Sequence, residues 1–336
     1  MTYAYAARQG IVLAMRILLI VLIVIVSGWS NSDSAFAVVS RVATSGPAPA
    51  EAELVQPVLA LAWSGEPHLD LKTKYPVYNA LDSDPATTWV ANGQTALIEY
   101  EPAILKSVAL IPGYAKSGPL WQANRRPVKI RYRLYREEDG GTRTVAGPFA
   151  EAAIAASSTL PGANVLWNYI AVNDIAPSIA IEIQVVEGSQ ETAKSDDICI
   201  SEIALVGTTQ TAQPKGCIAV VKTWSIAENS RALGVDLQDR LAATFDTINF
   251  ENCTYEHSFT GGGNRSFVGK CRVEGDAKQG AGEIRYRFEG REELREGTPQ
   301  VETKSVQRTI NFRRLSRRLA VIDGLLYSGR VDFICP

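Results

Sequence analysis

Two segments in which apolar and polar residues alternate constrain the fold of this chain more than any other feature. Apolar residues occupy every second position in 128–135, and the same period runs through 179–186. A period of two is that of a β-strand with one face buried in a core, and no strong amphipathic helix separates these segments. Short alternating segments punctuated by Pro, Gly and Asn favour a β-sandwich or a jelly roll.

Length and charge limit the remaining choices. The chain has 336 residues, which allows two domains of ordinary size and an N-terminal extension. Hydrophobic residues make up 46% and charged residues 21%, a composition typical of globular proteins. Lys and Arg number 34 against 36 Asp and Glu, so the net charge of -2 gives no electrostatic reason to expect nucleic acid as a partner.

Residues 1–37 have the pattern of an export signal. Arg8 and Arg16 precede ten aliphatic residues at 17–26, and a small-residue cleavage pattern ends at Ala37. The alternative is an uncleaved signal anchor, since 11–29 is about as long as a membrane-spanning helix. Both interpretations place the rest of the chain outside the cytoplasm. We expect a secreted or periplasmic protein, or one held to the membrane only by this segment.

Changes in composition suggest where the domains begin and end. Residues 38–55 are rich in Ala, Ser and Pro and are predicted to be a flexible tether. The mainly β domain follows at 56–207. Polar turn formers at 208–216 indicate a linker, and a second domain then covers 217–336.

The second domain has a different pattern. Ser225 and Glu228 match a capping box, and the segment that opens at Asp236 places four apolar residues on one helical face: Leu237, Leu241, Phe245 and Ile248. Several strand-like segments follow. We therefore predict a smaller α+β domain, with one or two helices packed on an antiparallel sheet.

Three ordered blocks of residues carry a resemblance to a known family. The first is N-A-x-D-x-D-x-x-T-x-W from Asn79, the second is G-Y-x-K-S followed by N-x-R-P from Gly113, and the third is D-x-C-I-S-E-I from Asp197. With these blocks, 56–207 resembles the NADase-type discoidin-like glycan-binding module of the coagulation factor 5/8 C-domain superfamily. That resemblance implies a galactose-binding-like jelly roll that recognises carbohydrate or another cell-surface ligand. Family members occur in bacterial toxins beside an NAD glycohydrolase, but no such enzymatic half is recognisable in this chain.

A loop punctuated by Gly and Pro holds the candidate ligand-binding residues. Sugar recognition needs an aromatic ring against the C–H face of the sugar, with charged or amide groups at its hydroxyls. Within thirteen residues this loop offers such a set, consisting of Tyr114, Lys116, Trp121, Asn124 and Arg126. In the alternative interpretation, Tyr114 and Trp121 cap the core. Arg126 then pairs with an acidic residue such as Asp82 or Glu202.

The first block contains two further candidates. Trp89 begins an apolar strand, which favours a place in the core over ligand contact. Asp82 and Asp84 are spaced like oxygen ligands of a structural calcium ion. Ordinary turn chemistry explains the same spacing, because Asp side chains accept hydrogen bonds from nearby backbone amides. No other cofactor is expected.

The five cysteines are consistent with export. Cys253 and Cys271 lie nine residues either side of Gly262, so a hairpin centred there would place them opposite each other as a disulfide. Cys217 and Cys335 are a second candidate pair, and the sequence assigns no role to Cys199. The wide spacings, and a total of two histidines, argue against metal ligation by these cysteines.

The leading hypothesis is a non-catalytic exported binding protein that recognises a glycan or another cell-surface ligand. One alternative makes the first domain the targeting module of a two-carboxylate glycosidase in the second domain, with Glu283, Glu289 or Glu293 as candidate acids. Another makes the chain a structural or protein-interaction part of the cell envelope or of a secretion system, with a protein partner for the second domain. Arg313, Arg314, Arg317 and Arg318 form a compact basic cluster, which is expected to be a solvated face.

Overall fold

The computed structural model describes fourteen stretches of the chain. They are 40–64, 74–138, 143–155, 157–172, 174–189, 193–210, 218–226, 229–230, 235–236, 246–259, 263–274, 284–296, 301–315 and 318–334. The chain divides into two units, 1–37 and 38–336, and the predicted signal segment 1–37 lies outside the described residues. In the stretches given above, no helix is long and apolar enough to cross a membrane.

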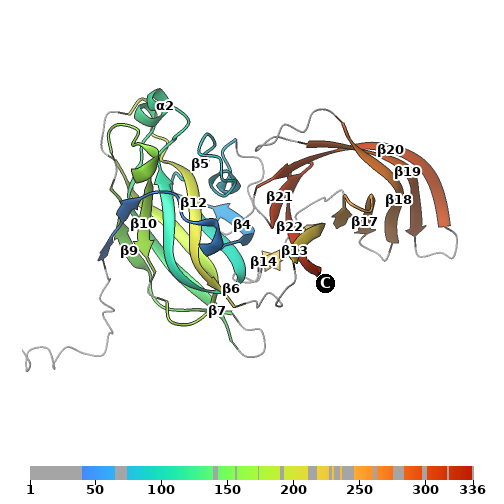
Figure 1. Ribbon diagram of the computed structural model, residues 1–336, viewed down its shortest axis with the longest axis horizontal. Coiled ribbons are helices and arrows are strands. Elements are labelled where there is room, and N and C mark those ends of the chain that lie inside the picture. Colours follow the sequence, from blue (N-terminus) through green and yellow to red (C-terminus); the bar gives the residue numbers. More distant parts are fainter. Residues whose placement is uncertain are drawn as a thin grey trace, which may run out of the picture. The chain divides into compact units, whose positions relative to one another are not determined.

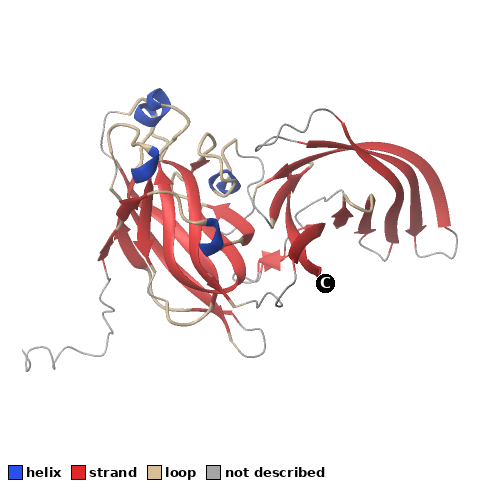
Figure 2. Cartoon of the chain, viewed as in Figure 1, coloured by secondary structure: helices blue, strands red, loops and turns tan. Residues whose placement is uncertain are grey.

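The first region, through residue 209, is built almost entirely from strands (Figures 1 and 2). The strands are β1 (Ser40–Val42), β2 (Thr44–Gly46), β3 (Leu54–Val55), β4 (Pro57–Trp63), β5 (Trp89–Val90), β6 (Thr95–Pro112), β7 (Pro127–Glu137), β8 (Arg143–Val145), β9 (Ala150–Ala153), β10 (Trp167–Ala171), β11 (Ser178–Gly188) and β12 (Cys199–Thr209). The helical segments are short: η1 (Glu51–Glu53), η2 (Val77–Ala80), α2 (Gly118–Ala123) and η3 (Ala163–Val165).

The long strand β6 links the two layers of a β-sandwich. Its N-terminal half pairs antiparallel with β4 and β11, and its C-terminal half pairs antiparallel with β10 and β12. β7 extends the first layer beyond β11, and β9 follows β7. This arrangement confirms the mainly β fold that the alternating segments predict.

The core of the sandwich lies where the alternating residues meet. Ile181 and Ile183 of β11, Ile130 of β7 and Ile98 of β6 are completely or almost completely buried. Trp89 has no exposed surface, and its indole N–H donates to Gln94 Oε1 at 2.9 Å. The prediction that this tryptophan belongs to the core is therefore confirmed.

Within the predicted tether 38–55, the described residues 40–55 include three short strands. β1 pairs parallel with β9, β2 pairs with β10, and β3 pairs with β12. The Ala- and Pro-rich composition concealed these short strands because each is only two or three residues long and sits at a sheet edge. The segment from Ser40 onward is thus part of the sandwich.

The second region forms a barrel. Its strands are β13 (Ile218–Ile226), β16 (Thr247–Asn249), β17 (Thr254–Phe259), β18 (Gly263–Glu274), β19 (Ile284–Glu296), β20 (Val301–Arg314), β21 (Leu319–Ile322) and β22 (Leu325–Ile334). Each pairs antiparallel with the next, and β22 returns to pair with β13, so the barrel is closed. A separate two-stranded ladder joins β14 (Asn229–Ser230) and β15 (Val235–Asp236).

The barrel modifies the predicted α+β arrangement. Ser225, read as a helix cap, lies within β13, and Ile248 lies within β16. The remaining apolar positions of the predicted helix, in 237–245, lie outside the described residues. The antiparallel sheet was predicted correctly, but its closure depends on the pairing of β13 with β22, about a hundred residues apart in sequence. No local sequence pattern predicts a contact between strands so far apart in the chain.

The disulfide between Cys253 and Cys271 is confirmed, with the two Cα atoms 5.3 Å apart. The hairpin register differs from the prediction, because Phe259 pairs with Gly263, whereas a hairpin centred on Gly262 would pair Phe259 with Arg265. Cys253 immediately precedes β17 and has a φ of 54°, and the disulfide joins it to a neighbour in β18. Cys217 and Cys335 lie outside the described residues, and Cys199 is a buried free thiol.

Candidate functional site

The three blocks that are far apart in sequence meet at one end of the sandwich. The amide of Gly113 donates to the carbonyl of Cys199 at 2.8 Å, and the amide of Cys199 donates to the carbonyl of Arg125 at 3.0 Å. The hydroxyl of Thr88 donates to the carbonyl of Ile200 at 3.0 Å. These bonds make β12 the common support of the other two blocks.

Two of the five predicted ligand contacts lie inside this end of the sandwich. Trp121 has no exposed surface, and its indole N–H donates to the carbonyl of Ser157 at 3.0 Å. Arg126 is 1% exposed, donates to the carbonyl of Trp121 at 2.7 Å and lies 5.5 Å from that ring's centroid. This burial corrects the expectation that both side chains meet a ligand. They stabilise the loop from beneath.

Gly113 explains how the tryptophan and the arginine pack so closely. Its φ is +109°, and a Cβ at this position would lie 2.9 Å from Trp121 Cζ3 and 2.9 Å from Arg126 Cγ. A glycine therefore allows the backbone to turn and the two side chains to fill the space beside it. The Gly113 of the second block is a structural requirement of the loop.

The accessible part of the loop contains a pair of tyrosines. Tyr114 and Tyr75 pack edge to face, with their centroids 6.4 Å apart and an angle of 71° between the rings. Lys74 Nζ lies 5.1 Å from the centroid of Tyr75. Lys116 is exposed, and Asn124 is half-buried with its side-chain N–H donating to the carbonyl of Leu120 at 2.9 Å.

The phenol of Tyr114 keeps its proton at neutral pH. Partial burial, then the neighbouring Tyr75 and Cys199, raise its pKa above the ordinary value, while Lys74 acts in the opposite direction. A neutral phenol both donates and accepts hydrogen bonds. The thiol of Cys199, whose pKa burial raises to about 12, is also neutral and unreactive here.

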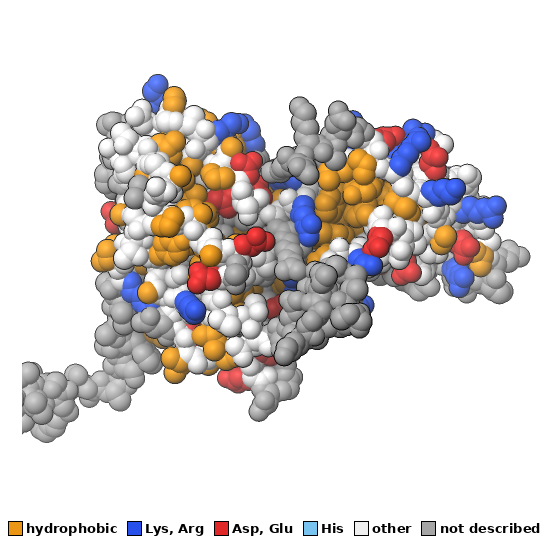
Figure 3. All heavy atoms as spheres, viewed as in Figure 1, with side chains coloured by type: hydrophobic (Ala, Val, Ile, Leu, Met, Phe, Trp, Pro, Cys, Tyr) orange, Lys and Arg blue, Asp and Glu red, His pale blue; other side chains and the backbone are white. Residues whose placement is uncertain are grey.

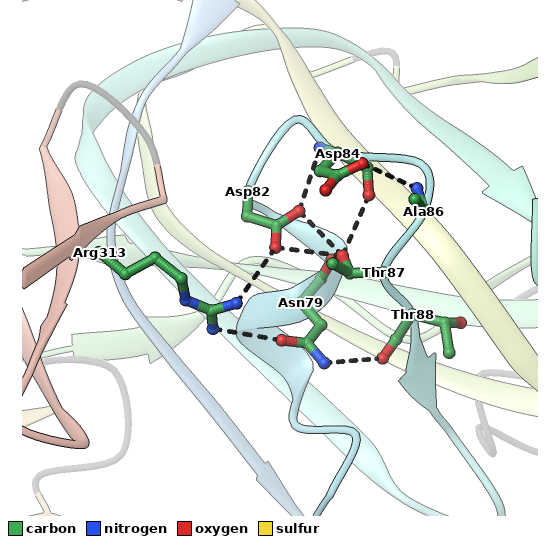
Figure 4. A network of polar contacts seen from close by, with 7 residues as sticks. All are labelled: Asn79, Asp82, Asp84, Ala86, Thr87, Thr88 and Arg313. Carbon is green, nitrogen blue, oxygen red and sulfur yellow. Dashed lines mark hydrogen bonds and ion pairs between the residues drawn. The ribbon is translucent and has the colours of Figure 1, made fainter. Parts of the chain in front are cut away.

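The turn that carries Asp82 and Asp84 is held by its own side chains (Figure 4). Thr87 Oγ1 lies 3.0 Å and 3.1 Å from the two carboxylate oxygens of Asp82, and the amide of Asp84 donates to Asp82 Oδ1 at 3.1 Å. Asp84 Oδ1 accepts from the amide of Ala86 at 2.9 Å. These are the contacts of an Asx-type turn.

A residue of the predicted basic cluster reaches this turn. Arg313 Nη1 lies 3.9 Å from Asp82 Oδ2, and Arg313 Nη2 donates to Asn79 Oδ1 at 3.4 Å (Figure 4). Arg318 pairs similarly with Glu101 at 2.7 Å. The cluster is therefore not simply a solvated face. Arg313, and not Arg126 as expected, is the arginine that lies beside the carboxylate of Asp82.

Asp82 and Glu202 are both buried and titrate unusually. Burial raises the pKa of Asp82 to about 6, although bonds from Asp84 and Thr87 and the charge of Arg313 lower it. Burial, followed by the charges of Asp82 and Asp84, raises the pKa of Glu202 to about 9. Glu202 is 2% exposed and its Oε1 makes no hydrogen bond. At neutral pH the Glu202 carboxyl is accordingly protonated.

A cavity of about 300 Å³ lies beside this turn. Its lining includes Ser83, Pro85, Glu202 and Trp167, and the remainder is mostly apolar. The cavity therefore presents one neutral carboxyl among hydrophobic walls, an environment that disfavours a charged occupant.

The calcium expected at Asp82 and Asp84 remains a prediction. Both carboxylates are engaged in turn contacts, and the guanidinium of Arg313 supplies the positive charge near Asp82. Across the described ranges, no three His, Cys, Asp or Glu side chains are grouped so that they could hold a metal ion. We therefore derive no role for a metal ion here.

The acids proposed for a glycosidase do not meet in the described part of the barrel. Glu289 pairs with Arg287 at 2.8 Å on the outer face of β19, and Glu293 lies on the same outer face, four residues further along the strand. Glu283 lies outside the described residues.

Sequence reasoning missed Tyr75 and Lys74 as site residues. They precede the first block, and only the fold brings the Tyr75 ring against that of Tyr114. The aromatic pair Tyr75–Tyr78 in YPVY was a visible signal, but nothing in its spacing distinguishes a ligand surface from a core position.

No family model matches the chain, and no curated protein matches it. Among solved structures, CpGH89CBM32-4 of Clostridium perfringens is 15% identical, covering 45% of this chain and 96% of that chain with a TM-score of 0.25. The CBM32-1 and CBM32-2 domains of Clostridium perfringens ZmpB in complex with GalNAc are 9% identical, covering 84% and 91% with a TM-score of 0.31. Truncated AlyQ with CBM32 and alginate lyase domains is 10% identical, covering 81% and 80% with a TM-score of 0.29. Because these TM-scores lie below 0.5, we base neither fold nor function on them.

Proposed function

We propose that this chain is a non-catalytic exported protein whose sandwich binds carbohydrate through the loop end defined by Tyr75 and Tyr114. The observation that carries the proposal is the convergence of the three family-like blocks on one end, where two accessible tyrosines lie edge to face. Aromatic rings of this kind stack on the apolar face of a sugar. The resemblance to the NADase-type glycan-binding family points to the same ligand class.

Polar groups around the tyrosines can satisfy sugar hydroxyls. Lys74 and Lys116 are exposed, Asp84 is half-buried, and the neutral phenol of Tyr114 donates and accepts. Trp121 and Arg126 hold the loop from below, so the surface is built before a ligand arrives. A site formed in advance loses less entropy on binding.

A glycan array probed with the full-length protein tests the proposal. We expect binding to a restricted set of neutral or acidic glycans, and loss of that binding in Tyr114→Ala. Tyr114→Phe should retain most of it, because the ring remains. Tyr169→Ala is the matched control, since Tyr169 is a partly exposed tyrosine of β10 outside this loop. No binding by folded wild-type protein, or equal binding by Tyr114→Ala, would contradict the proposal.

A further inference from the structure

One arginine of the barrel reaches the part of the sandwich that carries a tyrosine of the carbohydrate surface. Figure 3 shows Lys and Arg side chains interspersed with Asp and Glu over the β18–β20 part of the barrel, so charge alone distinguishes no position there. Arg313 differs because it contacts residues of the sandwich. In β20 the buried residues Ile310 and Phe312 belong to the barrel core. Because side chains alternate along a strand, Arg313 lies on the outer face.

The guanidinium of Arg313 contacts three residues of one short stretch. Nη1 lies 3.9 Å from Asp82 Oδ2, and Nη2 donates to Asn79 Oδ1 at 3.4 Å (Figure 4). The guanidinium carbon also lies 5.6 Å from the centroid of the Tyr78 ring. Asp82 and Asn79 are both buried, and Tyr78 is partly buried against the sandwich core. Arg313 therefore contacts groups that the fold already holds in place.

The three partners of Arg313 lie in segment 75–89, which begins at Tyr75 of the carbohydrate surface. The amide of Val90 donates to the carbonyl of Tyr75 at 3.2 Å, so the two ends of the segment are tied together. The ring of Tyr75 in turn packs edge to face against that of Tyr114. A shift of this segment would therefore move one ring of the tyrosine pair.

Hydrogen bonds inside the segment connect Arg313 to its far end. The side chain of Asn79 accepts from Arg313, and its Nδ2 donates to the carbonyl of Thr88 at 3.1 Å. Thr87 Oγ1 lies 2.7 Å from the carbonyl oxygen of Asn79 and 3.0 Å from Asp82 Oδ1. The guanidinium therefore supports a hydrogen-bonded network that extends to the end of the segment.

A second arginine of the barrel contacts the sandwich at a different place. Arg318 Nη1 lies 2.7 Å from Glu101 Oε1, and Glu101 belongs to β6, outside segment 75–89. Leu315 and Leu319, which lie on either side of Arg318 in the sequence, are buried in the same cluster as the sandwich core. Replacing Arg318 therefore removes a contact between barrel and sandwich without removing one from the segment.

We propose that Arg313 is a positioning residue for the carbohydrate surface, because it holds segment 75–89 and with it the ring of Tyr75. The inference rests on the proposed function of the sandwich and extends it, since it gives the barrel a part in glycan binding. Contacts of a charged donor with buried acceptors stabilise more than contacts between neutral groups. A surface that is held in place before the glycan arrives loses less entropy on binding.

Hydrogen exchange of the full-length protein, followed by mass spectrometry, tests the positioning without any ligand. Arg313→Ala should speed exchange of the amides of Thr87 and Val90 about fivefold, the effect expected when a partly exposed ion pair is lost. Arg313→Lys, which keeps the charge, should restore part of the protection. Arg318→Ala is the matched control and should leave these amides within about twofold of the wild type. Unchanged exchange in Arg313→Ala, or an equal increase in Arg318→Ala, would overturn the proposal.

Isothermal titration with the glycan that gives the strongest array signal tests the consequence for binding. Arg313→Ala should bind this glycan about fivefold more weakly than the wild type, and Arg318→Ala should bind it with nearly the wild-type affinity. Melting temperatures show that the variants are folded. Faster exchange with undiminished glycan affinity would overturn the link to the carbohydrate surface. Absence of binding by the wild type would contradict the proposed function instead, and the exchange measurement would then decide whether Arg313 holds the segment.

Discussion

The sandwich and the barrel place their accessible functional groups in opposite parts of a β-fold. The sandwich fills its interior with side chains such as Trp89 and Trp121 and presents its accessible tyrosines on loops. The barrel fills only part of its interior, and its remaining inward positions carry charge around a cavity. A surface made by loops tolerates changes in sequence and length. The lining of a barrel cavity depends on the strand register, which decides which side chains face inward.

The contrast shows that alternation of side chains along a strand does not always mean that the inward face is apolar and buried. In β11 the alternating residues Ile181 and Ile183 are buried as the pattern predicts. In β19 the inward series begins with apolar residues and continues through Gly290 to Glu292. The same geometric rule operates in both strands, but in the second the inward face also carries charged residues that line a cavity.

Replacing the buried tryptophan of the loop should have the largest effect. Trp121→Ala removes a fully buried ring and should lower the free energy of unfolding by about 3–5 kcal/mol. Trp121→Phe should cost less, because a ring still fills the space. Urea unfolding followed by circular dichroism measures both. If Trp121 instead contacts ligand, Trp121→Ala would leave stability within about 0.5 kcal/mol and abolish glycan binding.

A glycine of the barrel should come next. Gly269→Ala places a Cβ 2.5 Å from the carbonyl oxygen of Glu289 and 2.6 Å from Phe267 Cζ, and should cost about 1–3 kcal/mol by overpacking. Gly118→Ala is the control, since nothing lies within 4 Å of its Cβ. Both are compared by thermal unfolding. Equal melting temperatures for the two variants would show that the packing around Phe267 is looser than described.

The pH dependence of Glu202→Gln tests the buried carboxyl of the sandwich. Its pKa is about 9 in the folded protein against 4.5 ordinarily, so folding takes up a proton between these pH values. The wild type therefore loses stability as pH rises through this window, and glutamine does not. We expect Glu202→Gln to gain about 1.4 kcal/mol on the wild type between pH 6 and 7, because the folded and unfolded wild type differ there by about one bound proton. A difference that stays constant with pH would mean that Glu202 titrates normally.

The smallest effect is expected for Arg313→Ala. Arg313 is partly exposed and lies 3.9 Å from a carboxylate whose pKa is about 6, so its removal should cost about 1 kcal/mol at pH 8. At pH 5 the cost should shrink, because Asp82 is then largely protonated. Arg291→Ala, an exposed arginine, serves as the control in chemical unfolding. An undiminished cost at pH 5 would assign the effect to Asn79 or to packing instead.

Much of the sandwich could be predicted because its signals are local. Alternation fixed the faces of β7 and β11, and the three blocks indicated which loops would matter. The loop between Gly113 and Arg126 has no period, so the sequence could not show that Trp121 is buried while Tyr114 is accessible. Tyr75 was missed because its partner is 39 residues away.

The barrel was harder to predict for a different reason. Its closure depends on the long-range pairing of β13 with β22, which leaves no trace in either strand. Glu292, Lys304 and Arg308 resemble solvent-facing charges until the register places them in the same inward rows as Phe267 and Phe288. Charged residues at every second position from a buried aromatic residue were the signal that could have identified the cavity.

A calorimetric titration with a glycan that binds on the array tests the central claim most directly. Wild type, Tyr114→Ala, Tyr114→Phe and Tyr169→Ala are each titrated with that glycan. The account predicts that Tyr114→Ala loses the glycan, whereas Tyr114→Phe and Tyr169→Ala retain most of the affinity. Equal binding by Tyr114→Ala, or equal loss in Tyr169→Ala, would contradict it.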